Sequence, residues 1–188
     1  MKRIFILFAV SIMVVLGLNT VKAQFIRENA FNLPMVGGEV AFLQNDTFPN
    51  LFVEDVYPIV KTWIEQNFPT AKYAKTKQGE DLLEATIHFK IDDQHIQAPL
   101  YYEGNLTIKW KDEVIQILLN KLSYVPGQLN GKSKKKAGAT DVSFTVKQQV
   151  RSGADKLYPH TWDSLNAYGD ALLNDFHKYI STTLQTKL

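Results

Sequence analysis

Cysteine is absent from the 188 residues of this chain. Its absence excludes disulfide bonds, thiolate metal sites, a cysteine nucleophile and a lipid-modified cysteine as a membrane anchor. The sequence also lacks a Gly-x-Ser-x-Gly nucleophile elbow and a glycine-rich phosphate-binding loop. A domain formed by this chain must therefore be held together by its hydrophobic core.

An excess of charge of one sign is also missing. The chain has 21 Lys and Arg residues against 19 Asp and Glu residues, a formal charge of +2. Three of the basic residues, Lys2, Arg3 and Lys22, lie in the first 23 positions, which contain no acidic residue. The rest of the chain has 18 basic and 19 acidic residues, a charge of −1. Because bulk nucleic-acid binding needs several cations, we expect no nucleic-acid partner.

A long hydrophobic run occurs near the amino terminus, over residues 4–18. It follows Lys2 and Arg3, and Val21 and Ala23 provide small or short residues at positions −3 and −1 before Gln24. This layout predicts a signal peptide over residues 1–23, cleaved between Ala23 and Gln24. The run is shorter than the about 20 apolar residues of a spanning helix, although a retained anchor is the alternative. We therefore expect an exported protein, periplasmic or secreted, with no transmembrane segment after signal removal.

The remaining residues show first a strand pattern and then a helix pattern. Residues 24–37 predict an extended lead-in, and residues 38–188 predict a single domain. Val40 and Phe42 indicate a short strand. The apolar spacing that follows predicts a helix that starts near Val53 and ends before Pro69.

Alternating apolar residues then predict an antiparallel sheet. The clearest strand is 82–91, followed by 100–110 and, after a tight turn at Lys111 and Asp112, by 113–125. Residues 142–150 are interpreted as a further strand. A long amphipathic helix from Trp162 onward closes the chain. The pattern predicts an α+β fold with two layers, in which two helices cover one face of an antiparallel sheet of four to five strands.

These residues resemble a known family. The features are a Gly-x-Val-x-Phe strand, a helix with tryptophan one turn before Asn-Phe, and a lysine-aspartate hairpin, here Gly38, Val40, Phe42, Trp63, Asn67, Phe68, Lys111 and Asp112. Over about residues 36–124 the chain resembles an exported Bacteroidota domain of unknown function with a TATA-binding-protein-like (TBP-like) fold. The resemblance implies a fold and an exported location, and no catalytic residues.

The TBP-like fold does not by itself predict DNA binding, because folds are reused for many functions. The sheet face opposite the helices would present Glu84, Thr86, His88, Lys90, Glu103, Asn105 and Lys109. This set is mixed in sign and lacks the apolar wedges that kink a minor groove. We therefore expect no DNA partner.

Our main hypothesis is an exported, non-enzymatic binding or interaction module without a cofactor. Its partner would be a small molecule, a glycan or an envelope protein, bound on the open face of the sheet or in a cleft between the sheet and the closing helix. The candidate ligand-binding residues are aromatic, although packing in the core is the alternative role for such residues: Tyr102, Trp110, Trp162, Tyr168 and Phe176.

Two alternative functions are open. A metal-dependent hydrolase could be centred on Asp92, Asp93 and His95, where carboxylates and an imidazole lie close in sequence, although such a cluster is also typical of a polar hairpin loop. A structural subunit of an envelope assembly would instead expose a contiguous apolar patch.

Overall fold

The computed structural model describes residues 31–49, 51–74, 81–93, 98–125, 138–157 and 160–185. The strands are β1 (Met35–Val36), β2 (Glu39–Val40), β3 (Phe42–Thr47), β4 (Lys72–Tyr73), β5 (Leu82–Asp93), β6 (Ala98–Lys111), β7 (Val114–Tyr124) and β8 (Thr140–Asp141). The helices are α2 (Val53–Asn67), α3 (Val142–Arg151), α4 (Ala154–Leu157) and α5 (Asp163–Gln185). None of these helices is both long enough and apolar enough to cross a membrane.

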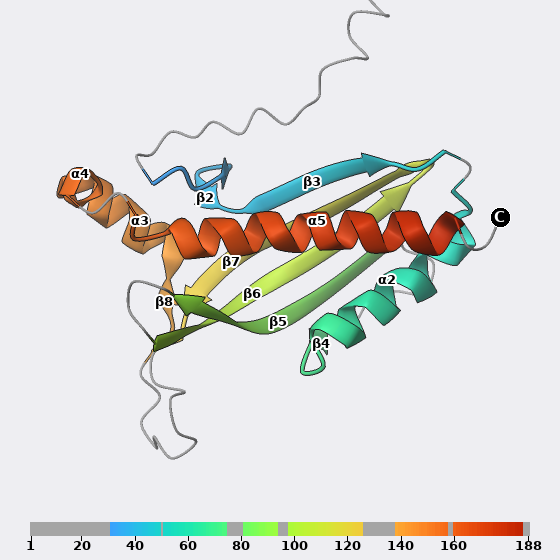
Figure 1. Ribbon diagram of the computed structural model, residues 1–188, viewed down its shortest axis with the longest axis horizontal. Helices are drawn as coiled ribbons and strands as arrows, with labels where there is room; N and C mark the ends of the chain where they lie inside the picture. The colour runs from blue at the N-terminus through green and yellow to red at the C-terminus, as the bar shows by residue number, and fades with distance from the viewer. Residues whose placement is uncertain are drawn as a thin grey trace, which may run out of the picture.

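The main sheet has the strand order β3-β7-β6-β5-β4, and β8 adds to β7. All of its described strand pairs are antiparallel. β1 and β2 form a separate small hairpin. Helices α5 and α2 both lie over one face of the sheet (Figure 1). The predicted two-layer α+β fold is confirmed, with six strands because β4 and β8 add short pairings at the margins.

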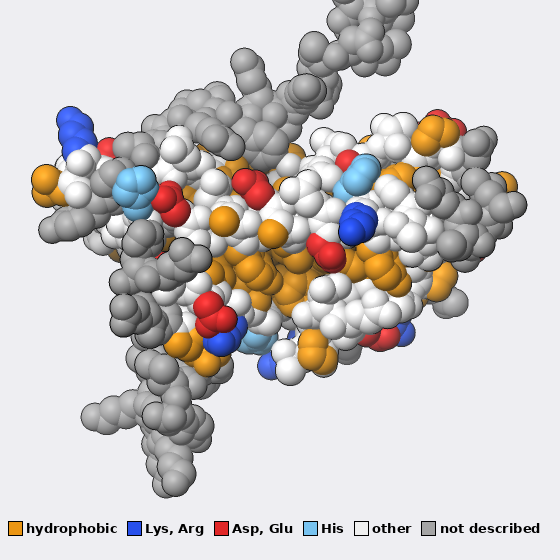
Figure 2. Space-filling view, in the orientation of Figure 1, with side chains coloured by type: hydrophobic (Ala, Val, Ile, Leu, Met, Phe, Trp, Pro, Cys, Tyr) orange, Lys and Arg blue, Asp and Glu red, His pale blue; other side chains and the backbone are white. Residues whose placement is uncertain are grey.

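Alternating burial explains why the long strands form one layer. On β5, Leu83, Ala85 and Ile87 are buried, whereas the residues between them are exposed or half-buried. β6 and the first part of β7 repeat this pattern. Apolar side chains are visible along the side of α5 that faces β5 and α2 (Figure 2). The core therefore lies between the helices and one face of the sheet.

The turn between β6 and β7 lies one residue later than predicted. Lys111 pairs with Val114, so the two turn residues are Asp112 and Glu113. Asp112 has φ 54°, the left-handed conformation that aspartate tolerates better than most residues and that two-residue hairpins use.

A β-bulge explains why Leu119 and Leu122 of β7, three residues apart, are both buried on the same face. The register between β6 and β7 shifts opposite Gly104, and Lys121 has φ 50°. The extra residue reverses the alternation, so Leu122 is fully buried and Lys121 is exposed. A Cβ on Gly104 would come within 2.9 Å of the Leu122 side chain. Glycine at this position therefore makes room for the bulge.

The prediction of a strand over residues 142–150 is wrong, because this segment is helix α3. Asp141 caps the helix: its side chain accepts a hydrogen bond of 2.6 Å from the Phe144 backbone N–H. Val142 and Val146, four residues apart, face the core, whereas Phe144 is exposed. The period is thus helical, and the two-residue spacing of Phe144 and Val146, which would place both on one side of a strand, was misleading.

The closing helix α5 is fixed to both β3 and α2. Asp175 accepts a hydrogen bond of 2.9 Å from the Trp63 indole of α2, and His177 Nδ1 lies 3.1 Å from Asp46 Oδ1 of β3. Gly169 faces the Phe42 ring so closely that an added Cβ would lie 2.1 Å from it. Glycine therefore sets the distance between α5 and the sheet.

Part of the predicted lead-in packs against the core of the domain. Phe31 and Leu33, within the predicted lead-in, have 1% and 0% exposure and belong to the core. Ala41 donates a backbone hydrogen bond to the Pro34 carbonyl. The packed part of the chain therefore begins before residue 38. The predicted signal peptide, with Ala23 and Gln24, lies outside the described residues.

Candidate functional site

The face of the sheet opposite the helices carries paired polar side chains. His88 Nε2 of β5 lies 2.9 Å from Glu103 Oε2 of β6, its cross-strand partner. Lys90 Nζ lies 2.7 Å from Asp92 Oδ1 on the same strand. Farther along this face, the Gln116 side chain donates to Asn45. Neither α2 nor α5 covers this face, which we call the open face.

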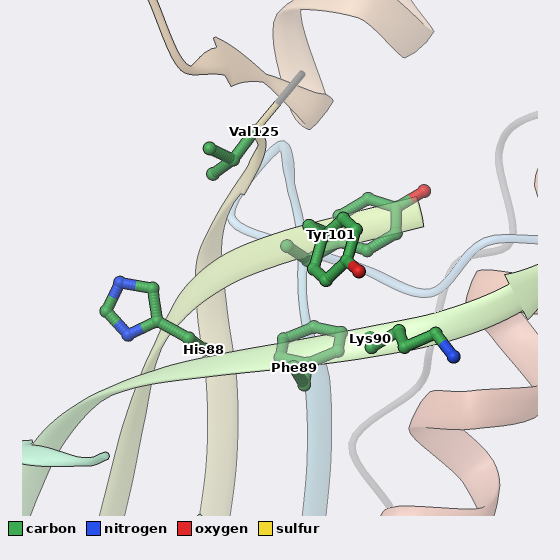
Figure 3. Close-up of a pocket in the computed structure, with 6 residues that line it drawn as sticks. His88, Phe89, Lys90, Tyr101 and Val125 are labelled. Atoms are coloured by element: carbon green, nitrogen blue, oxygen red, sulfur yellow. The ribbon is translucent and has the colours of Figure 1, made fainter. Parts of the chain in front are cut away.

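A pocket lies where β7 ends beside β5 and β6. Its volume is about 210 Å³, and its lining residues are His88, Phe89, Lys90, Tyr101, Tyr102 and Val125. Figure 3 shows His88 and Lys90 on either side of Phe89 along β5, with Tyr101 on the neighbouring strand and Val125 beyond the end of β7.

Strand alternation assigns most of the pocket side chains to the open face. Lys90 pairs directly with Tyr101 across the two strands, so their side chains lie on the same face. Phe89 and Tyr102 are buried on the opposite, helix-covered face. The ring of Tyr124 contacts that of Tyr102, so Val125, one residue later, belongs to the open face. The pocket thus combines an ammonium group, an imidazole and a phenol.

The side chain of Lys90 is the cationic group of this pocket, and its neighbour Asp92 stabilises the charged form. The hydrogen bond and the negative charge of Asp92 raise the pKa of Lys90 above its ordinary value. On the other face, burial raises the pKa of Tyr102, and the charges of Asp93 and Tyr124 raise it further. The phenol of Tyr102 therefore stays neutral. The pocket therefore offers hydrogen-bond donors and the Lys90 ammonium, which is paired with Asp92, beside half-buried Tyr101.

The five predicted aromatic residues do not gather at one site. Tyr102 and Tyr168 both stack on the core ring of Phe89, with centroids 5.5 and 4.5 Å from that of Phe89. Trp110 contacts Tyr57 on α2. These contacts fill the space between the sheet and the helices, which is where the cleft was predicted.

The two remaining aromatic residues also make core contacts. The Trp162 indole donates a hydrogen bond of 2.7 Å to Gln149 of α3. Phe176 packs edge-on against Trp63, with ring centroids 4.9 Å apart. Of the five predicted residues, Tyr102 borders the pocket described above.

The other pocket residues were not among the predicted site residues. Alternation in the sequence places His88, Lys90 and Tyr101 on the polar face of their strands. It gives no sign of where β7 ends relative to β6, and that ending creates the pocket. Val125 carries no chemical signal in the sequence at all.

The structure separates the two carboxylates of the predicted metal site. Asp92 and Asp93 belong to strand β5 and not to a hairpin loop. Asp92 is exposed and pairs with Lys90, whereas Asp93 is buried on the other face. Adjacent strand residues point to opposite faces, so these two side chains do not converge on one cation. His95 lies outside the described residues, among which no group of three or more potential metal-ligating side chains is present.

No protein-family model and no curated protein matches the chain by sequence. Solved structures with a similar arrangement include a TBP-like protein from Parabacteroides distasonis, with TM-score 0.59 and 13% identity, covering 78% of this chain and 96% of that chain. The fold is TBP-like. A DUF4468 family protein from Bacteroides ovatus also matches, with TM-score 0.57 and 10% identity, over 78% of this chain and 89% of that chain.

The TBP-like fold predicted from the sequence is thus confirmed, and both solved neighbours are Bacteroidota proteins. At such low identity the similarity establishes the fold alone. The function of this TBP-like domain must be argued from its own surface.

Proposed function

We propose that this TBP-like domain is an exported, non-enzymatic binding module whose ligand occupies the pocket on the open face. The proposal of export rests on the signal-peptide layout of residues 1–23. The observation that carries the binding proposal is the pocket itself, where Lys90, His88 and Tyr101 surround a volume of about 210 Å³. None of the described helices covers these side chains, so a ligand can reach them without a change in the core.

The chemistry of the pocket favours a ligand that joins a ring to an anionic group. Tyr101 offers a ring face for stacking against a sugar or another flat group. The Lys90 ammonium, already paired with Asp92 at 2.7 Å, has further N–H donors for a ligand carboxylate, and charge-assisted hydrogen bonds are stronger than neutral ones. His88 is held by Glu103 at 2.9 Å and so is fixed in orientation. A uronic acid, free or within a glycan, provides both groups.

The ligand class can be tested by titration. Protein purified after expression of the full sequence is titrated with galacturonate and glucuronate oligosaccharides, with neutral glucose oligosaccharides as the comparison, and amide chemical shifts are measured. We expect shifts at His88, Lys90 and Tyr101 with the uronates. Tyr101→Ala and Lys90→Met should each weaken binding roughly tenfold or more, as loss of a charged hydrogen bond or stacking contact implies.

A matched control is Lys109→Met, which removes a lysine from the same face of β6 away from the pocket. It should change the affinity less than about twofold. Binding that Tyr101→Ala and Lys90→Met leave intact, or uronate-induced shifts at residues elsewhere, would refute this site. Native mass spectrometry of the protein from its own cells provides an independent view, since a retained mass would identify the ligand class directly.

A further inference from the structure

The outer edge of β5 lacks a neighbouring strand over much of its length. β4 pairs with β5 at Ala85 and Thr86. From Ile87 to Asp92, none of the described strands pairs with that edge. Figure 1 shows this half of β5 at the margin of the sheet, beyond the end of β4. An unpaired edge presents backbone N–H and C=O groups that can pair with another strand.

The direction of the backbone groups identifies which residues could pair. The Glu84 carbonyl accepts a hydrogen bond of 2.9 Å from Ala74, so this residue directs its backbone groups toward the outer edge. The Asp81 carbonyl instead accepts from Trp110 of β6. Because the direction alternates along a strand, the backbone groups of His88, Lys90 and Asp92 face outward.

We propose that a second copy of this chain pairs antiparallel with this edge, about a twofold axis beside Ile91. In this register Lys90 of each copy lies opposite Asp92 of the other. Hydrogen-bonded antiparallel pairs exchange both of their N–H···O bonds, so the two Lys90–Asp92 pairs would supply four backbone hydrogen bonds. A twofold pairing is the usual arrangement of identical subunits.

Charge complementarity selects this register over its neighbours. An axis at Lys90 would place the two lysines opposite each other, and an axis at Phe89 would place His88 opposite Lys90. The axis at Ile91 gives opposite charges in both pairs. Lys90 Nζ already lies 2.7 Å from Asp92 Oδ1 within one chain. The dimer would therefore join two such pairs into a four-membered network of alternating charge.

Charge-reversal variants at Lys90 and Asp92 test the proposed strand pairing. Sedimentation velocity is measured on protein expressed from the full sequence, from about 10 µM to 1 mM, the range of weak association. Lys90→Asp and Asp92→Lys should each weaken self-association at least about tenfold, because like charges then face each other. Both side chains are largely solvent-accessible, 48% and 79% exposed, so both variants should fold.

The decisive sample is an equimolar mixture of Lys90→Asp and Asp92→Lys proteins, which should associate more strongly than either alone and about as strongly as the unaltered protein. Lys109→Asp, on the same face of the sheet and away from this edge, should have no effect. A protein that stays monomeric up to 1 mM, two variants that associate as strongly as the unaltered protein, or a mixture that gains nothing would each overturn the proposal. If a variant fails to fold, hydrogen exchange of the unaltered protein tests the pairing instead. The backbone amides of Lys90 and Asp92 should become more protected from exchange as the protein concentration rises.

Discussion

Replacing Gly169 with alanine should destabilise the domain, although alanine is the better helix former. In an exposed helix this change stabilises by about 0.5–1 kcal/mol. Here the new methyl group would lie 2.1, 2.2 and 2.5 Å from three atoms of the Phe42 ring. That ring is 1% exposed, and its strand is paired with β7 through Leu119. Neither partner can move aside freely.

Overpacking of this kind costs about 1–3 kcal/mol, and distances this far below van der Waals contact favour the upper part of that range. After the gain in helix propensity, we expect a net loss of about 1–2 kcal/mol in the free energy of unfolding. For a domain of this size the midpoint of thermal unfolding should fall by roughly 2–8 °C, at 2–4 °C for each kcal/mol.

Urea unfolding followed by tryptophan fluorescence measures the effect, with Asp170→Ala, at an exposed neighbouring position of α5, as the control. The sharper test is the double variant. Phe42→Val removes the three ring atoms concerned, so in that background Gly169→Ala should be neutral or stabilising. A Gly169→Ala protein as stable as the unaltered chain would refute the packing of α5 on β3. So would an equal loss in both backgrounds, because the two residues would then not be coupled.

Three further predictions follow from single residues. Asp141→Ala should lower the free energy of unfolding by about 1 kcal/mol through loss of the cap of α3, whereas Asp141→Asn should retain most of it in the same urea assay. Lys121→Gly should stabilise by about 0.5 kcal/mol, because glycine adopts the positive φ of the bulge without strain; Lys121→Ala should not, and a loss with glycine would contradict the bulge. Burial raises the pKa of Tyr168 to about 12 from 10.0, so its stabilising contribution is complete below pH 10 and is lost as the pH rises toward 12. Tyr168→Phe should flatten the fall in stability over that range, as measured by urea unfolding at several pH values.

The layers of the fold could be predicted because one sheet face is apolar and the other polar. Leu83, Ala85 and Ile87 alternate with polar residues, and strand alternation has a single physical cause, burial of one face. The start of α2 at Val53 was predicted correctly for a similar reason, because apolar spacing and Pro58 together restrict where that helix can begin. Local patterns were sufficient wherever burial was one-sided.

The errors arose where local patterns were ambiguous or long-range pairing decided. Phe144 and Val146 have the two-residue spacing of one strand face, yet Asp141 and Val142 together with Val146 fit a capped helix. The bulge at Lys121 could not be predicted from the sequence, because the extra residue of a bulge could be accommodated at several positions along β7. The site itself depends on where β7 ends beside Tyr101, which local sequence does not encode. The five aromatic residues proposed as ligand contacts, with core packing as the alternative role, belong to the core or pack against it, as is common for side chains of their size.

The position of α5 in the chain governs when the protein can complete its folding. The β5–β6–β7 meander has short connections and can pair soon after it leaves the ribosome. The part of its apolar face that α5 covers stays exposed until this helix has been synthesised, since α5 follows every other described element and packs against β3, near the opposite end of the described chain. Until then the exposed face is a surface that a holding chaperone can bind. A polypeptide whose core cannot form early stays unfolded for longer. It can then pass through a translocation pore as an unfolded chain, as the export proposed above would require.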